Sequence, residues 1–211
     1  MGRVDLMFNS YLLLAERPTL LHTGSRPMWE GLRSQLSQVL PLDKLAYVVV
    51  PHFEADECGA LSLLLQEAHP TVVCSRMGAG QLMGFGIVEK PQPMGDGDRL
   101  DLGDRELEMV GAPQEMHLWD GILPFDHKTG MLFSADFLSQ MGGNTPHFAD
   151  PPDLGAMANM SRGNIPCTEP YERVVERLLR LPIRQVAPGH GACFTQRIPE
   201  MVRGYFGRSL L

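Results

Sequence analysis

The chain has 211 residues, of which 44% are hydrophobic and 20% charged, so it carries enough apolar sequence to build one buried core. Its 18 Lys and Arg residues against 25 Asp and Glu residues give a formal charge of −7, and no basic run is present. This balance argues against a nucleic-acid-binding protein and against docking on an anionic membrane surface. The longest apolar stretches are too short to cross a bilayer, so we expect no transmembrane helix.

The cysteines and the N-terminus indicate a reducing compartment. The four cysteines lie far apart without a CxxC pair, which favours neither a disulfide framework nor a zinc ribbon nor a rubredoxin iron site. The first residues lack the basic start, apolar core and small cleavage residues of a signal peptide. We therefore expect a cytoplasmic protein.

The first half of the chain alternates strand and helix patterns. The apolar, β-branched run at 45–50 predicts a buried strand, and Asp56 is the expected N-cap of the helix that follows. Four glycines between residues 78 and 86 predict a loop or hinge. The predicted elements here are strands at 9–15, 19–22, 45–50 and 71–74 and helices at 28–40 and 57–67.

The second half continues the alternation. The polar, turn-rich segment 91–104 predicts a hairpin region, and the irregular, proline-rich segment 142–166 predicts a long loop or lid. Strands are expected at 106–110, 131–134 and 184–187, and a helix at 171–181. Strands and helices that alternate in this way, with strand-rich ends, indicate an α/β sandwich rather than a helical bundle.

The segment Pro-His-Phe-Glu-Ala-Asp-Glu at 51–57 carries the strongest chemical signal. In an extended chain His52, Glu54 and Asp56 point to the same side, at the carboxyl end of a buried strand. Glu57 falls at the start of the next helix, where the helix dipole favours an anion. Such strand ends commonly hold sites in α/β sheets.

Three further candidates, His117, Asp136 and His190, each follow a predicted strand. Three imidazoles and four carboxylates are costly to gather in one pocket without counter-charge. Two divalent cations would neutralise the charge of −4 on Glu54, Asp56, Glu57 and Asp136. The other four histidines, His22, His69, His127 and His147, are expected to be ordinary core or surface residues.

Taken together, VVVPHFEADE, MHLWDGILPFDHKTGMLFSADF and APGHG resemble the diiron domain of flavodiiron proteins and of stand-alone oxygen-binding diiron proteins. These belong to the metallo-β-lactamase superfamily. The resemblance implies a metallo-β-lactamase-like αββα sandwich as a single domain over 1–211. The opening NSYLLL…TLLHTG resembles the first strand pair of the superfamily, with His22 where an Asp is usual.

Carried over residue by residue, the resemblance implies that His52, Glu54 and His117 hold one metal. Asp56 and His190 would hold the second metal, and Asp136 would bridge the two. The last His of the family's HxExDH motif is Glu57 here. Two alternatives follow: Glu57 is an extra carboxylate ligand, or the second metal has an open position. A carboxylate–imidazole set without thiolate suits iron or manganese better than a structural zinc site.

The leading hypothesis is therefore a non-haem diiron protein that binds dioxygen or nitric oxide and reduces it. The chain ends at Leu211, so we expect no flavodoxin domain and no FMN on this chain, and electrons would come from a separate flavodoxin, rubredoxin or reductase. The alternatives are an oxygen sensor or carrier without sustained turnover, and a binuclear zinc hydrolase of a thioester, lactone or phosphoester. A homodimer is a further expectation from the resemblance.

Overall fold

The computed structural model describes residues 6–112, 121–140, 147–152 and 169–204. These residues form two five-stranded sheets. The first sheet has the order β1-β2-β3-β4-β5 and the second has the order β10-β9-β8-β7-β6. The first-sheet strands are β1 Tyr11–Leu13, β2 Thr19–Leu21, β3 Tyr47–Val50, β4 Thr71–Ser75 and β5 Gln92–Met94. The second-sheet strands are β6 Arg99–Asp101, β7 Glu106–Gly111, β8 Ile122–Asp126, β9 Met131–Ala135 and β10 Gln185–Pro188.

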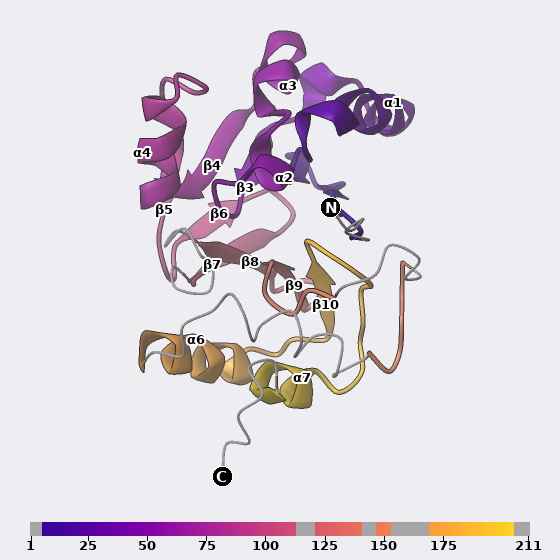
Figure 1. Cartoon of the computed structure of the whole chain (residues 1–211), viewed down its shortest axis with the longest axis vertical. Coiled ribbons are helices and arrows are strands. Elements are labelled where there is room, and N and C mark those ends of the chain that lie inside the picture. The colour runs from indigo at the N-terminus through magenta and orange to yellow at the C-terminus, as the bar shows by residue number, and fades with distance from the viewer. Residues whose placement is uncertain (1–5, 113–120, 141–146, 153–168, 205–211) are drawn as a thin grey trace, which may run out of the picture.

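Helices cover the outer face of each sheet, which gives four layers (Figure 1). Three helices pack on the first sheet: α1 Trp29–Val39, α3 Leu61–Glu67 and α4 Arg76–Gly84. Two pack on the second sheet: α6 Glu169–Arg180 and α7 Ile198–Gly204. The predicted αββα sandwich is confirmed.

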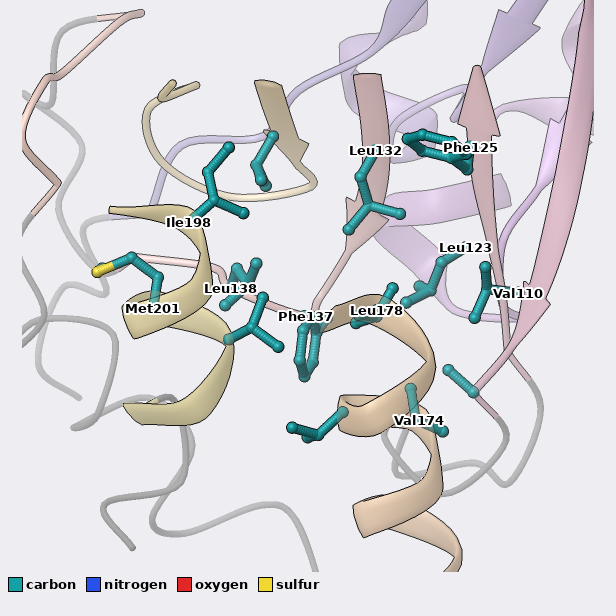
Figure 2. Packing of buried hydrophobic residues seen from close by; sticks show 14 of the residues in the cluster. Val110, Leu123, Phe125, Leu132, Phe137, Leu138, Val174, Leu178, Ile198 and Met201 are labelled. Atoms are coloured by element: carbon teal, nitrogen blue, oxygen red, sulfur yellow. The ribbon is translucent and has the colours of Figure 1, made fainter. Parts of the chain in front are cut away.

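Strand alternation divides the apolar residues between the layers. Val48 and Val50 of β3 face the helices, whereas Val49 faces the second sheet. The outer core of the second sheet is closed by Val174 and Leu178 of α6 and by Met201 of α7 (Figure 2). Because both faces of each sheet are covered, a central strand such as β3 (Tyr-Val-Val-Val) is apolar along its whole length.

The predicted loop at 78–86 is wrong, because most of this segment belongs to helix α4. The Ser75 side chain accepts a hydrogen bond from the Gly78 amide at 2.9 Å and so caps the helix. Ala79 and Leu82 are buried against the first sheet. The burial of these side chains outweighs the low helix propensity of the glycines.

The predicted hairpin at 91–104 is also wrong. Strand β5 pairs with β4 in the first sheet, while β6 pairs with β7 in the second sheet. The segment therefore crosses from one sheet to the other, and Met94 and Leu100 both enter the core between the sheets.

The helix predicted at 57–67 is divided into α2 Ala55–Cys58 and α3. The Ala60 amide donates to the Gly24 carbonyl at 2.9 Å, so the helical ladder is interrupted. Glu54, not Asp56, occupies the N-cap position of α2, and Asp56 lies in its first turn.

The remaining predicted helices and strands match observed elements, apart from small differences at their ends. Most of the predicted loop at 142–166 lies outside the described residues. Within the part of the chain that the structure describes, no helix is long and apolar enough to cross a membrane.

We predict that Leu178→Ala lowers the free energy of unfolding by about 2–5 kcal/mol, because it leaves a cavity in a close-packed layer. Leu178 is 1% exposed and packs between α6 and the second sheet. Urea denaturation followed by circular dichroism measures the loss. Glu176→Ala, on the exposed face of the same helix, is the matched control, and an equal loss in both variants would contradict this packing.

Candidate metal centre

Strand direction brings the candidate residues together. Strand β2 runs parallel to β3 in the first sheet, and β9 runs parallel to β10 in the second. His52 follows β3, Asp136 follows β9 and His190 follows β10. The Asp136 carboxylate lies near both His52 and His190, so these strand ends converge at one edge of the sandwich. The site therefore takes side chains from both sheets.

The first half of the site is built on the turn after β3. His52 is fully buried, and its Nε2 lies 3.2 Å from Oε2 of Glu54. The Pro51 carbonyl accepts a hydrogen bond from the Ile122 amide, which ties this turn to the second sheet. The Glu54 carbonyl accepts from the Cys58 amide at 2.9 Å, so the start of α2 fixes the backbone of Glu54.

The second half pairs His190 with Asp56. Nε2 of His190 lies 3.1 Å from Oδ2 of Asp56. Nδ1 of His190 lies 2.9 Å from the Met7 carbonyl, which favours the tautomer with the proton on Nδ1. The ring of Phe8 meets the His190 ring edge-on, with centroids 5.1 Å apart.

Asp136 joins the two halves. Its Oδ2 lies 3.5 Å from Nε2 of His52, and its Oδ1 lies 3.2 Å from Nε2 of His190. Ala135, just before it, has a left-handed backbone with φ of 46°, which turns the chain out of β9. One carboxylate therefore reaches both imidazoles, through a different oxygen for each.

The turn around His190 depends on a glycine. Gly191 has φ of 90°, a backbone conformation that other residues rarely adopt. A Cβ at this position would lie 2.7 Å from the Gln140 Cβ. The Gly-His-Gly sequence therefore lets the backbone around His190 pack closely on its neighbours.

The carboxylates strongly favour the protonated form of His190. Burial alone would lower the pKa of His190, but hydrogen bonds to Asp136 and Asp56 outweigh it and raise that pKa to about 10. Burial alone would raise the pKa of Asp56 and the pKa of Asp136. The hydrogen bond and charge of His190 prevail there too, and they lower the pKa of Asp56 and of Asp136.

Glu57 lies on the Nδ1 side of the His52 ring. It is 1% exposed, and its Oε1 lies 3.9 Å from Nδ1 of His52. Its other oxygen is in direct contact with Nδ1 of His22, which is also 1% exposed. His52, Glu57 and Asp136 offer ligand atoms that all lie within 4.8 Å of one another.

Among the expected site residues, the structure brings together His52, Glu54, Asp56, Glu57, Asp136 and His190. His117 lies outside the described residues. His22, expected from the sequence to be an ordinary core or surface residue, contacts Glu57 in the structure. The signal that could have found it is its place directly after strand β2, which is parallel to β3.

The described residues fit a pair of divalent cations. Nε2 of His52 and Nε2 of His190 each face a carboxylate of their own and share Asp136. Without a metal, the His190 proton supplies positive charge to this acidic cluster, a role that a cation also fills. The donors are nitrogen and oxygen atoms, the set that suits iron or manganese.

The architecture and the site define a metallo-β-lactamase-like protein with carboxylates and imidazoles at the sandwich edge. The chain belongs to the family described as ODP family beta lactamase, whose model matches residues 6–191.

Relatives by sequence include two larger proteins. A protein of Thermosynechococcus vestitus assigned as diflavin flavoprotein A 1 is 34% identical over 94% of this chain and 36% of its own length. A nitric oxide reductase from Moorella thermoacetica is 24% identical over 94% of this chain and 52% of its own length. The chain thus spans about a third to a half of the curated relatives that it matches.

Solved structures share the fold at low identity. Rubredoxin oxygen:oxidoreductase from Desulfovibrio gigas superposes with a TM-score of 0.87 and 22% identity, over 98% of this chain and 54% of that one. A peroxy diiron species of the chemotaxis sensor ODP gives a TM-score of 0.82 and 19% identity, over 99% of this chain and 89% of that one.

We predict that the metal-free protein loses stability as the pH rises above neutrality. The folded-state pKa of His190 lies above its ordinary value of 6.5, at about 10. The stability that the His190 proton gives to the fold is therefore complete below pH 6.5. It is lost as the pH rises through the folded-state pKa. Urea titrations of metal-free protein at several pH values measure this trend. His190→Asn, which cannot be protonated in this range, should flatten that part of the profile, and an unchanged profile would contradict the ion cluster.

Proposed function

We propose that this protein is a non-haem diiron protein that binds dioxygen or nitric oxide and reduces it with electrons from a separate donor. The observation that carries the proposal is the placement of Asp136. Its two oxygens lie 3.5 Å from Nε2 of His52 and 3.2 Å from Nε2 of His190. A carboxylate that reaches two imidazoles in this way is suited to bridge two metal ions.

The proposed ligand set follows the two halves of the site. His52 and Glu54, with His117, hold one iron, and Asp56 and His190 hold the other, with Asp136 between them. Glu57 is the seventh candidate, either as an additional ligand or as a residue outside the set. Manganese or zinc are the alternative metals. Two ferrous ions, once bound, would supply electrons to one diatomic ligand.

This chain's own residues prepare the site for that chemistry. The contact with the Met7 carbonyl keeps a proton on Nδ1 of His190, so Nε2 is the nitrogen that would bind a metal once the metal displaces its proton. His52 and His190 are buried, at 0% and 4% exposure, so water has little access to these rings. The carboxylates lower the net positive charge of a bound metal pair, which favours its oxidation.

The names of the relatives support the substrates and the donor. An oxygen reductase that takes electrons from rubredoxin and a nitric oxide reductase are both similar to this chain. The chain spans only part of such proteins. We further propose that a separate flavodoxin, rubredoxin or reductase supplies the electrons, that this chain binds no FMN, and that it forms a homodimer. A cytoplasmic location is part of the same proposal, since ferrous iron persists best in a reducing compartment.

An oxygen sensor or carrier is the second candidate function. The structure of the chemotaxis sensor ODP favours it, because this chain covers 89% of that protein as well as 99% of itself. A sensor needs the diatomic ligand to bind and the site to change oxidation state, but it does not need sustained turnover.

We predict about two irons per chain after anaerobic purification from iron-supplied cells, measured by elemental analysis. Asp136→Ala removes the bridge and should cost at least one iron. His190→Ala should empty the second site, while His52→Ala should spare the second site more. His127→Ala removes an imidazole that is 39% exposed and paired with Glu108, so this control should keep both irons. Full two-metal content in His190→Ala would contradict the ligand set, and two zincs in place of iron would favour a hydrolase.

We also predict that the reduced protein reacts with dioxygen or nitric oxide, which absorbance stopped-flow can measure. Steady consumption of the gas with reduced rubredoxin or flavodoxin present supports the reductase. A single rapid reoxidation without turnover, whichever donor is offered, supports the sensor. No reaction with either gas in a protein loaded with two irons would contradict both functions.

A further inference from the structure

Glu57 and His22 form a buried pair next to the proposed iron site. Each residue is 1% exposed, and Nδ1 of His22 is in direct contact with Oε2 of Glu57. A buried carboxylate needs a hydrogen-bond donor or a positive charge nearby, because burial without one is costly. In its Nδ1–H tautomer, the His22 imidazole can donate to the Glu57 carboxylate that it contacts.

The backbone fixes this pair in place. The Thr23 amide donates to the Glu57 carbonyl at 2.8 Å, and the His22 amide donates to the Val49 carbonyl at 3.2 Å. His22 itself has φ of 62°, a left-handed conformation that non-glycine residues seldom adopt. Strand β2, strand β3 and helix α2 therefore all constrain where the two side chains meet.

The pair lies on the Nδ1 side of His52. Oε1 of Glu57 is 3.9 Å from Nδ1 of His52, whereas Nε2 of the same ring faces Glu54 and Asp136. The two nitrogens of an imidazole point in widely different directions. At 3.9 Å the carboxylate is beyond hydrogen-bond distance of Nδ1, but it lies on the side from which a ring whose Nε2 binds metal is commonly oriented.

The turn after strand β10 lies next to the other carboxylate oxygen of Glu57. A Cβ added at Gly189 would lie 3.2 Å from Oε1 of Glu57, closer than ordinary van der Waals contact. The glycine therefore allows the Pro-Gly-His turn to pack against this carboxylate. His22 contacts one oxygen of Glu57, and the Gly189 turn lies close to the other, so both oxygens already have neighbours outside the metal pair.

We propose that His22 and Glu57 act as one positioning unit for His52, and that Glu57 is not a metal ligand. His22 holds the carboxylate, and the carboxylate orients the His52 ring and increases the basicity of its Nε2. The metal held by Asp56, His190 and Asp136 then keeps a coordination position that Glu57 does not fill. This inference rests on the proposed two-metal site and decides between the two roles that the sequence leaves open for Glu57.

Anaerobic titration of the full chain with Fe(II), and separately with Co(II), tests the proposal. Glu57→Gln keeps the size of the side chain but removes its charge. We expect it to retain two metals per chain with about tenfold weaker affinity, and an unchanged Co(II) visible spectrum. The spectrum reports coordination number, so weaker binding with an unchanged spectrum separates a positioning role from the loss of a ligand.

Variants at His22 test whether the two residues act as a unit. Glycine and asparagine both tolerate the left-handed backbone at this position, but only asparagine offers an N–H near the place of Nδ1. We expect His22→Gly to weaken metal binding about tenfold and His22→Asn to restore most of the affinity. The double variant His22→Gly with Glu57→Gln should bind about as well as either single variant, because both changes break the same unit.

A second imidazole–carboxylate pair in the chain provides the control. His127 lies 2.8 Å from Glu108 on the second sheet, and His127→Gly should leave metal affinity unchanged. Circular dichroism of the metal-free variants checks folding, and Glu57→Gln still decides the question where His22→Gly does not fold.

Three outcomes would overturn the proposal. Loss of one metal or a changed Co(II) spectrum in Glu57→Gln would make Glu57 a ligand. Wild-type affinity in Glu57→Gln and in a folded His22→Gly would leave the pair without any role at the metal. Failure of the wild-type chain to bind metal would remove the proposed function together with this inference, whereas the first two outcomes remove the inference alone.

Discussion

The arrangement of the site depends on the electrostatic cost of gathering carboxylates at a largely buried sheet edge. Asp56, Asp136 and Glu57 lie beside three imidazoles, with little solvent to screen their charges. The positive charge of protonated His190 offsets part of this cost, and Asp56 and Asp136 stabilise that proton. The turn at Gly191, the left-handed backbones of Ala135 and His22, and the strand ends bring these groups within contact distance.

Much of this arrangement is legible in the sequence, because it depends on local rules. The buried, β-branched run predicts a strand that ends near residue 50, as β3 does. The alternation of side chains in an extended chain predicts that His52 and Glu54 lie on the same side. Asp136 and His190 are predictable for the same reason, since each directly follows an apolar strand. The alternation of helices and strands indicates an α/β sandwich, and the resemblance to metallo-β-lactamase-like proteins implies its αββα order.

The features that the sequence did not predict depend on tertiary contacts. Helix α4 contains glycines that favour a loop, and its stability comes from Ala79 and Leu82 packing on the sheet. The segment between β5 and β6 resembles a hairpin because its turn is local, yet its two strands find partners in different sheets. His22 was missed because its partner, Glu57, is distant in sequence and only the parallel pairing of β2 with β3 brings them together.

The division of the site between the two sheets has a consequence for how the protein matures. His52, Glu54 and Asp56 are carried by the first sheet and Asp136 and His190 by the second, so a bound metal pair would cross-link the two halves of the sandwich. Such a cross-link closes a chain loop of more than a hundred residues, as a long-range disulfide does in secreted proteins. Neither sheet holds the complete set of donors, so tight metal capture must wait until the sheets have docked. Loading of the proposed metal pair would then report that folding is finished, and a partly folded chain would have low affinity for free metal.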